Sequence, residues 1–308
     1  MRAQVAVLAA ALCFATTGTA QAVAHAAAGP FAVGMARIAL GGAVLWAASL
    51  AVARKGPPPA RTRGAALPLA LAAAGVLAYQ PLFFLGTREG GVAVGTVIAL
   101  GSAPVFTGLA DAVSLRRRPP LRWAAATAVA LVGVWLVSGL ADHGVSVRPQ
   151  AALASLGAGA SYALYTVAIK AVIDRGRPPA QAMGAVFGLA AACALPLLAV
   201  AGVGWLASPR GWALALWLGL VATALAYALF GWGLARLRPA SVATLTLAEP
   251  LGATLLGLGV LHEPLSLAAR AGLAAIAAGL AVLILPTRRA ARPDGPDPGE
   301  PGPPTRPK

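Results

Sequence analysis

Apolar residues run along this chain in stretches of roughly 20, separated by short segments rich in arginine, proline and glycine. A helix rises about 1.5 Å per residue, so about 20 apolar residues cross the ~30 Å hydrocarbon layer of a membrane. Ten such stretches are predicted as spanning helices, at residues 3–23, 31–53, 64–86, 91–113, 121–140, 150–172, 181–204, 211–235, 239–261 and 267–286. The pattern therefore predicts an all-α integral membrane protein with ten transmembrane helices.

The composition supports this prediction and argues against a water-soluble protein. The chain is 59% hydrophobic and only 11% charged, with a mean hydropathy of +0.78, whereas soluble domains carry about 25% charged residues. The formal net charge of +15 comes from basic residues in short loops and the C-terminal tail. They form no basic face with interleaved aromatic residues, so no nucleic-acid partner is expected.

The distribution of lysine and arginine predicts the topology. With a cytoplasmic N-terminus, 19 of the 24 basic residues fall on the cytoplasmic side and four on the opposite side, as the positive-inside rule expects. We therefore predict a multi-pass protein of the cell membrane with both termini in the cytoplasm. The alternative is that residues 1–26, with a basic start and small residues near Ala20, form a cleaved signal peptide, which would leave nine spans.

The two halves of the chain repeat one another. Ser102-Ala103-Pro104 aligns with Ala248-Glu249-Pro250 at an offset of 146 residues, and Ala78-Tyr79 aligns with Ala226-Tyr227 at an offset of 148. Each half holds five predicted spans, and five is odd, so the halves enter the membrane in opposite directions. Inverted repeats of this kind build many secondary transporters, with the substrate site near the midplane between the halves.

This repeat predicts the domain organisation. The first five-helix repeat covers residues 1–145 and the second covers residues 146–286. Residues 287–308 are rich in proline, glycine and charge, so they cannot bury apolar area and are predicted as a disordered cytoplasmic tail.

Several motifs resemble the EamA-type family of the drug/metabolite transporter superfamily, over roughly residues 3–286. They are Arg37 in the second span, Tyr162-Ala163-Leu164-Tyr165-Thr166 in the sixth, Leu247-Ala248-Glu249-Pro250 in the ninth, and His262-Glu263-Pro264-Leu265 before the tenth. The resemblance implies two five-helix repeats and a transporter that exports or exchanges amino acids, nucleobases, amines or drugs, commonly by proton coupling. The first repeat departs from the family where Arg117 replaces a frequent glutamate, which leaves Glu263 without a symmetric partner.

Two charged residues lie inside predicted spans. Glu249 is about ten residues from either end of its span, where an ionised group costs several kcal/mol unless it is paired or hydrated. We interpret it as the proton-coupling carboxyl or as part of its charge network; the alternative is that it stabilises a helix break at Pro250. Arg37 is predicted to pair with a carboxylate or an anionic substrate group. Its alternative role is to extend toward the outer surface.

Polar and aromatic residues at helical spacing predict a substrate-binding cavity, because such sites are mostly apolar with few polar anchors. The alternative for each is packing between helices or a place at the membrane interface. The candidate residues are Tyr79, Gln80, Thr96, Ser102, Tyr162, Tyr165, Tyr227, Trp232, Thr244 and Thr246. Asp111 is expected to form a surface ion pair with Arg116–Arg118 at the end of the fourth span.

The sequence predicts transport rather than catalysis. It holds no mutually placed nucleophile, base or metal-ligand set, and no Walker lysine motif, so no cofactor and no metal are expected. A facilitative channel and an intramembrane enzyme remain the alternatives. GxxxG spacings such as Gly91–Gly95 allow close helix packing within a monomer, and they also allow a homodimer.

Overall fold

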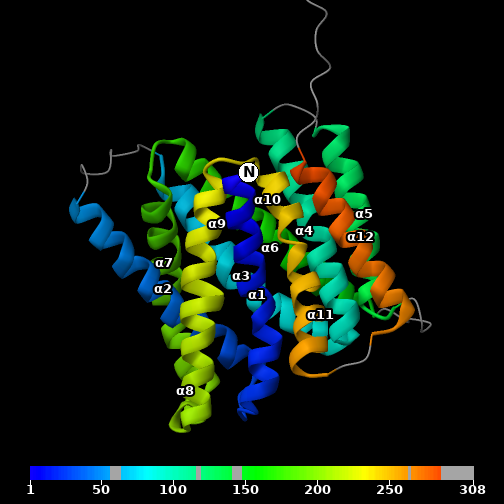
Figure 1. Ribbon diagram of the computed structural model, residues 1–308. Helices are drawn as coiled ribbons and strands as arrows, with labels where there is room; N and C mark the ends of the chain where they lie inside the picture. The colour runs from blue at the N-terminus through cyan, green and yellow to red at the C-terminus, as the bar shows by residue number, and fades with distance from the viewer. Residues whose placement is uncertain (56–63, 116–118, 141–147, 263–264, 286–308) are drawn as a thin grey trace, which may run out of the picture.

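The computed structural model describes residues 1–55, 64–115, 119–140, 148–262 and 265–285, and within them every regular element is helical (Figure 1). The helices of the first half are α1 (Arg2–Ala24), α2 (Pro30–Lys55), α3 (Ala66–Gly90), α4 (Val92–Leu115) and α5 (Leu121–Val137). Those of the second half are α6 (Pro149–Asp174), α7 (Pro179–Ala201), the 3₁₀ turn η1 (Gly204–Ala207), α8 (Pro209–Leu216), the π-helical segment η2 (Trp217–Leu225), α9 (Ala226–Leu234), α10 (Pro239–Leu245), α11 (Ala248–Val260) and α12 (Leu267–Ile284). The predicted tail lies outside the described residues.

These helices agree with the predicted spans. Nine helical stretches of the described chain are long and apolar enough to cross a membrane, and α5 is a shorter apolar helix of 17 residues. The eighth span is the continuous run α8–η2–α9, and the ninth is α10 followed by α11. The main boundary differences are in the first half, where α3 continues to Gly90 and α5 already ends at Val137. The protein is therefore an all-α integral membrane protein with five spans in each half.

The packing of the helices reproduces the repeat seen in the sequence. Helix α6, the first of the second half, packs against α3 and α4, and its counterpart α1 packs against the equivalent spans, α9 and α11. The two remaining pairs join equivalent helices to each other, α2 with α7 and α5 with α12. This exchange of partners is what a two-fold relation between the halves produces. It places α1, α3, α4, α6, α9, α10 and α11 around the middle of the bundle.

Two spans of the second half depart from a regular α-helix: the eighth contains the π-helical segment η2, and the ninth is broken. The ninth span breaks at Thr246–Leu247, because the ring of Pro250 would clash with the Thr246 carbonyl and Pro250 has no N–H to bond it. The Thr246 carbonyl accepts instead from the backbone N–H of Glu249, at 2.9 Å. A new helix then begins at Ala248, which is favourable because proline is tolerated in a first turn. The equivalent Pro104 lies inside the continuous helix α4.

Candidate functional site

A central cavity of about 310 Å³ lies between the two halves. Its walls come from both repeats, and most of them are apolar or aromatic. The lining residues include Phe14, Gln21, Gly34, Arg37, Tyr79, Gln80, Phe83, Phe84, Leu100, Tyr162, Tyr165, Tyr227, Thr246, Leu247, Glu249 and Ala253. Val33 and Val92 complete the lining near Gln21, and these three residues lie close to where α1 ends and α2 and α4 begin. The cavity therefore extends toward that end of the bundle.

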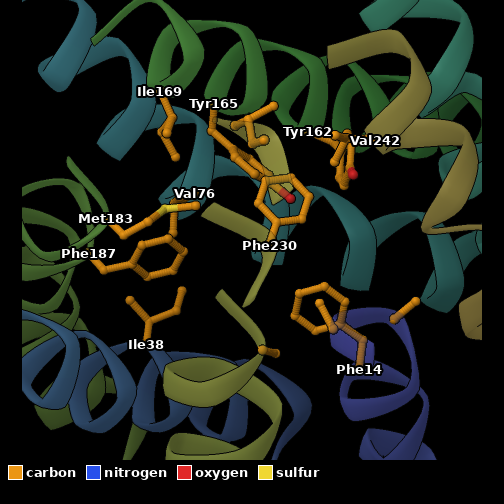
Figure 2. Close-up of a cluster of buried hydrophobic side chains, with 14 of the residues drawn as sticks. Phe14, Ile38, Val76, Tyr162, Tyr165, Ile169, Met183, Phe187, Phe230 and Val242 are labelled. Atoms are coloured by element: carbon orange, nitrogen blue, oxygen red, sulfur yellow. The ribbon is translucent and has the colours of Figure 1, made fainter. Parts of the chain in front are cut away.

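All four tyrosines of the chain line this cavity. Tyr162 and Tyr165 on α6 approach edge to face, with ring centroids 5.0 Å apart, and the ring of Tyr165 lies 6.1 Å from that of Tyr227 on α9. Phe14 on α1 closes the group, 5.0 Å from Tyr227. Figure 2 shows these α6 side chains meeting Phe230 opposite Phe14. Aromatic rings from three helices thus form one wall, suited to an apolar or planar solute.

The π-helical segment holds Arg37 in place. The guanidinium on α2 donates through Nε to Thr223 Oγ1 at 3.2 Å and through Nη2 to the Ala222 carbonyl oxygen at 2.9 Å. Both partners belong to η2, and π-helical turns of this kind occur frequently at functional sites. The side chain is only partly buried and lines the cavity. The extension of Arg37 to the outer surface is therefore not what the structure shows.

The break in the ninth span changes the setting of Glu249. The sequence placed this carboxyl in the middle of a helix, but the structure places it in the first turn of α11. The N-terminus of a helix carries partial positive charge, which favours a carboxylate there. Thr246, two residues before α11, lines the same wall, and its hydroxyl lies 3.0 Å from the Tyr162 hydroxyl. The position of Glu249 fits both interpretations, because the residue directly follows the helix break and also lines the cavity.

Arg37 and Glu249 bring opposite charges into one cavity without pairing directly. Among the described residues, the ion pairs within 4.0 Å are Arg88–Glu89, Arg148–Glu89, Lys170–Asp174 and Arg238–Asp111. Both charges of the cavity therefore remain available to a bound solute.

The structure brings most of the predicted lining residues together and leaves four elsewhere. Tyr79, Gln80, Tyr162, Tyr165, Tyr227 and Thr246 line the cavity with Arg37 and Glu249. Trp232 is 37% exposed on the outside of the bundle, stacked under the Arg236 guanidinium at 3.9 Å. Thr244 is fully buried and lies 2.8 Å from Thr127, hydroxyl to hydroxyl. The remaining two are on α4, where Ser102 donates to the Ala99 carbonyl at 3.2 Å, and Thr96 is partly buried; neither is part of the lining.

Sequence reasoning missed the contribution of α1 and the phenylalanines of α3. Phe14 and Gln21 on α1 line the cavity, as do Phe83 and Phe84 on α3. A signal for α1 existed, because the repeat makes it the counterpart of α6, where Tyr162 had been singled out. Nothing in the composition of the first span distinguishes these two residues from packing residues.

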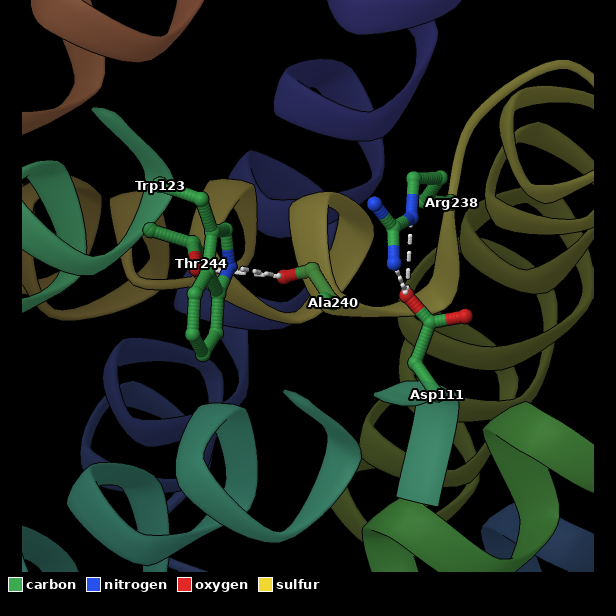
Figure 3. Close-up of polar contacts among 5 residues, drawn as sticks. All are labelled: Asp111, Trp123, Arg238, Ala240 and Thr244. Atoms are coloured by element: carbon green, nitrogen blue, oxygen red, sulfur yellow. Dashed lines mark hydrogen bonds and ion pairs between the residues drawn. The ribbon is translucent and has the colours of Figure 1, made fainter. Parts of the chain in front are cut away.

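Asp111 is in a different environment from the one expected. It is only 2% exposed, and its Oδ2 accepts from Nε of Arg238 at 3.0 Å and lies 3.0 Å from Nη2 (Figure 3). The partner thus comes from the second repeat, whereas Arg116–Arg118 lie outside the described residues. In the described part of the chain, Asp111 thus pairs with an arginine of the other repeat, and the pair combines a buried carboxylate with a partly exposed guanidinium.

Comparisons with known proteins agree with this arrangement. The model of the EamA-like transporter family matches residues 1–139 and again residues 150–285, so that each half carries one match. A relative from Bacillus subtilis (strain 168), described as "Uncharacterized transporter YwfM", is 40% identical over 284 residues, which cover 92% of this chain and 94% of the relative. A protein of known crystal structure shares the fold, with a TM-score of 0.78 and 21% identity over 92% of this chain and 96% of that one. The chain therefore belongs to the EamA-like transporter family of the drug/metabolite transporter superfamily, and it is a multi-pass membrane transporter.

Proposed function

We propose that the protein is a secondary transporter that binds a small organic solute in the central cavity and releases it on the other side of the membrane by alternating access. The observation that carries this proposal is a cavity of about 310 Å³ between the two repeats, lined by aromatic rings and by one guanidinium and one carboxyl group. Sites for small molecules have this composition, with an apolar wall and few polar anchors. The two repeats would provide two states of similar energy, one open to each side.

The charges of the cavity favour a zwitterionic solute with an apolar or aromatic part. Arg37 can bind a carboxylate through the donors that η2 leaves free, because a guanidinium has five N–H groups in a planar fork. Glu249 can accept from an ammonium group, and the tyrosine wall can pack against an apolar side chain. An amino acid fits these three features better than an amine, which would leave the guanidinium without an anionic partner, or a neutral nucleobase or uncharged drug, which would leave both charges without one.

The direction and the energy source complete the proposal. We place the protein in the cell membrane with both termini in the cytoplasm, because 19 of 24 basic residues then lie inside. The central cavity would then open to the exterior, as in an exporter that has released its solute. Glu249 is the group to which we assign proton coupling, since it is the acidic residue in the lining of this cavity.

A counterflow experiment tests the proposal. Proteoliposomes that contain the purified protein are loaded with one unlabelled solute at a time, from a panel of amino acids, nucleobases and amines. Uptake of the same solute in labelled form is then followed at pH 5.5 and pH 7.5. We expect saturable counterflow for an amino acid with an apolar side chain, and in wild type we also expect net uptake of that amino acid to respond to an imposed proton gradient. Glu249→Gln should still give counterflow, at higher solute concentrations because the ammonium group loses its carboxylate partner, and net uptake should lose the response to the gradient; a wild-type response in this variant would remove the coupling role.

A facilitative channel is the remaining alternative, and the same experiment separates it from a transporter. A channel conducts through a continuous path and gives no counterflow, whereas alternating access gives counterflow that saturates with solute concentration. The absence of counterflow for every member of the panel, with the solutes equilibrating freely, would replace the transporter by a channel.

A further inference from the structure

A second cavity of about 290 Å³ lies at the opposite end of the bundle from the mouth of the central cavity. It is formed where α4 and α6 end and where α9 connects to α10. Its charged lining residues are Asp111, Lys170, Asp174, Arg236 and Arg238. Within the described part of the chain, this cavity and the central cavity have no lining residue in common. A layer of protein therefore separates the two hollows, which lie toward opposite ends of the bundle.

Helix α10 forms part of that layer. Arg238 and Pro239, at its beginning, line the second cavity, whereas Ala243 and Thr246, at its end, line the central one. The helix has seven residues, which corresponds to a thickness of about 10 Å. The break at Thr246–Leu247 separates it from α11. A short helix that is not continuous with the rest of its span can move without moving that span.

Three polar contacts hold α10 against the first repeat, and Figure 3 shows two of them. The ion pair between Asp111 and Arg238 holds the beginning of the helix against α4, with Asp111 Oδ2 3.0 Å from both Nε and Nη2 of Arg238. Trp123 on α5 donates through Nε1 to the Ala240 carbonyl oxygen at 2.9 Å. The hydroxyls of Thr127 and Thr244 are 2.8 Å apart, as described above. All three contacts cross between the repeats, so any movement of α10 away from α4 and α5 must break them.

The repeat offers no equivalent ion pair at the other end of the bundle. At the offset of 146 residues, Asp111 corresponds to Gly257; Arg238 corresponds to Gly90 or Val92, depending on whether 148 or 146 is used. None of these residues carries a charge. The threonine contact is also missing, since Thr127 and Thr244 correspond to Leu273 and Ile98. Among the described residues, the ion pairs near that end join Glu89 to Arg88 and Arg148, whose side chains are 84% and 71% exposed, and exposed pairs contribute little.

We propose that the Asp111–Arg238 ion pair is a latch that keeps α10 closed between the two cavities and biases the protein toward the state in which the central cavity is open. This inference rests on the proposed function, and it identifies the second cavity as the other mouth of the transport path. Opening that mouth separates a carboxylate that is 2% exposed from its partner, and the charges must then be hydrated from the second cavity. An inverted repeat with a latch at one end only has two states of unequal population.

Cysteine labelling measures the latch without any solute. The chain has two cysteines, so Cys13→Ala and Cys193→Ala provide a background that carries none. Leu100→Cys then reports on the central cavity, and Ala171→Cys reports on the second one. A membrane-impermeant maleimide is added to sealed vesicles of either orientation. With the latch intact, the two reporters should be labelled from opposite sides of the membrane.

Removing the latch should change the side from which the central reporter is reached. We expect Asp111→Asn to raise the labelling rate of the Leu100→Cys reporter from the side of the second cavity at least tenfold. The neutral pair Asp111→Asn with Arg238→Gln leaves no unpaired charge and should do the same, which covers the case in which the single variant fails to fold. The exchanged pair Asp111→Arg with Arg238→Asp should restore labelling from one side. Asp174→Asn is the matched control, because its pair with Lys170 is 55% exposed at the aspartate and does not touch α10.

The outcomes distinguish the latch from the proposed function. If the central reporter stays inaccessible from the second side in both neutral variants, while the Ala171→Cys reporter is still labelled from there, the latch does not exist. An equal effect of Asp174→Asn would also overturn it. Changed labelling together with no counterflow for any solute would support the latch and reject the solute class. Counterflow of an amino acid with unchanged labelling would support the solute class and reject the latch.

Discussion

Arg37→Gln should weaken the binding of solutes that carry a carboxylate and leave their amides almost unaffected. In wild type, the guanidinium donates to Thr223 Oγ1 and to the Ala222 carbonyl oxygen, at 3.2 and 2.9 Å, and Arg37 also lines the cavity. A hydrogen bond to a charged group contributes about 1.5–3 kcal/mol, so its loss should raise Kd about tenfold to 150-fold. Arg37→Lys keeps the charge but loses the planar fork, so its Kd should lie between those of wild type and Arg37→Gln.

The assay is equilibrium binding to purified protein, with an apolar amino acid and its carboxamide as a matched pair of ligands. Arg148→Gln is the control variant, because that arginine side chain is 71% exposed and lies outside the central cavity. The ratio of the two Kd values should change only in the Arg37 variants. An equal loss of affinity for the acid and the amide would show that Arg37 maintains the shape of the cavity instead of binding the carboxylate.

Two further predictions concern packing and the outer surface. A Cβ atom at Gly133 would lie 2.6 Å from the Gly272 carbonyl oxygen, so Gly133→Ala should destabilise the α5–α12 contact by about 1–3 kcal/mol and lower the thermal midpoint in detergent. Gly101→Ala meets only an ordinary contact at 3.7 Å and should leave the midpoint unchanged; equal effects would contradict this reading of the packing. Trp232→Ala should keep counterflow within about twofold because the ring lies outside the cavity, whereas Tyr227→Ala should reduce it by tenfold or more, since that ring packs against Phe14 and Phe187 at 5.0 and 4.2 Å. Comparable losses in the two variants would place Trp232 on the transport path.

The amino-acid sequence alone determined which segments lie in the membrane and how they repeat. Ten apolar runs predict ten spans, because length and hydropathy are local properties that the bilayer imposes on each helix separately. The offsets of 146 and 148 residues predicted the two related halves, and the exchanged contacts of α1 and α6 agree with them. The sequence also singled out the four tyrosines, Gln80, Thr246, Arg37 and Glu249, because polar and aromatic groups are conspicuous in apolar helices, and these residues line the central cavity.

Only the tertiary structure decided which of these groups face one another. Thr244 and Thr246 are two residues apart at the end of α10, so their side chains leave the helix in different directions. The packing of α10 decides that Thr246 lines the cavity while Thr244 contacts Thr127. The partner of Asp111 lies 127 residues away, in a loop between two spans of the other repeat. Contacts at such separations depend on how whole helices pack, and the hydropathy of a segment is the same whichever helix it meets.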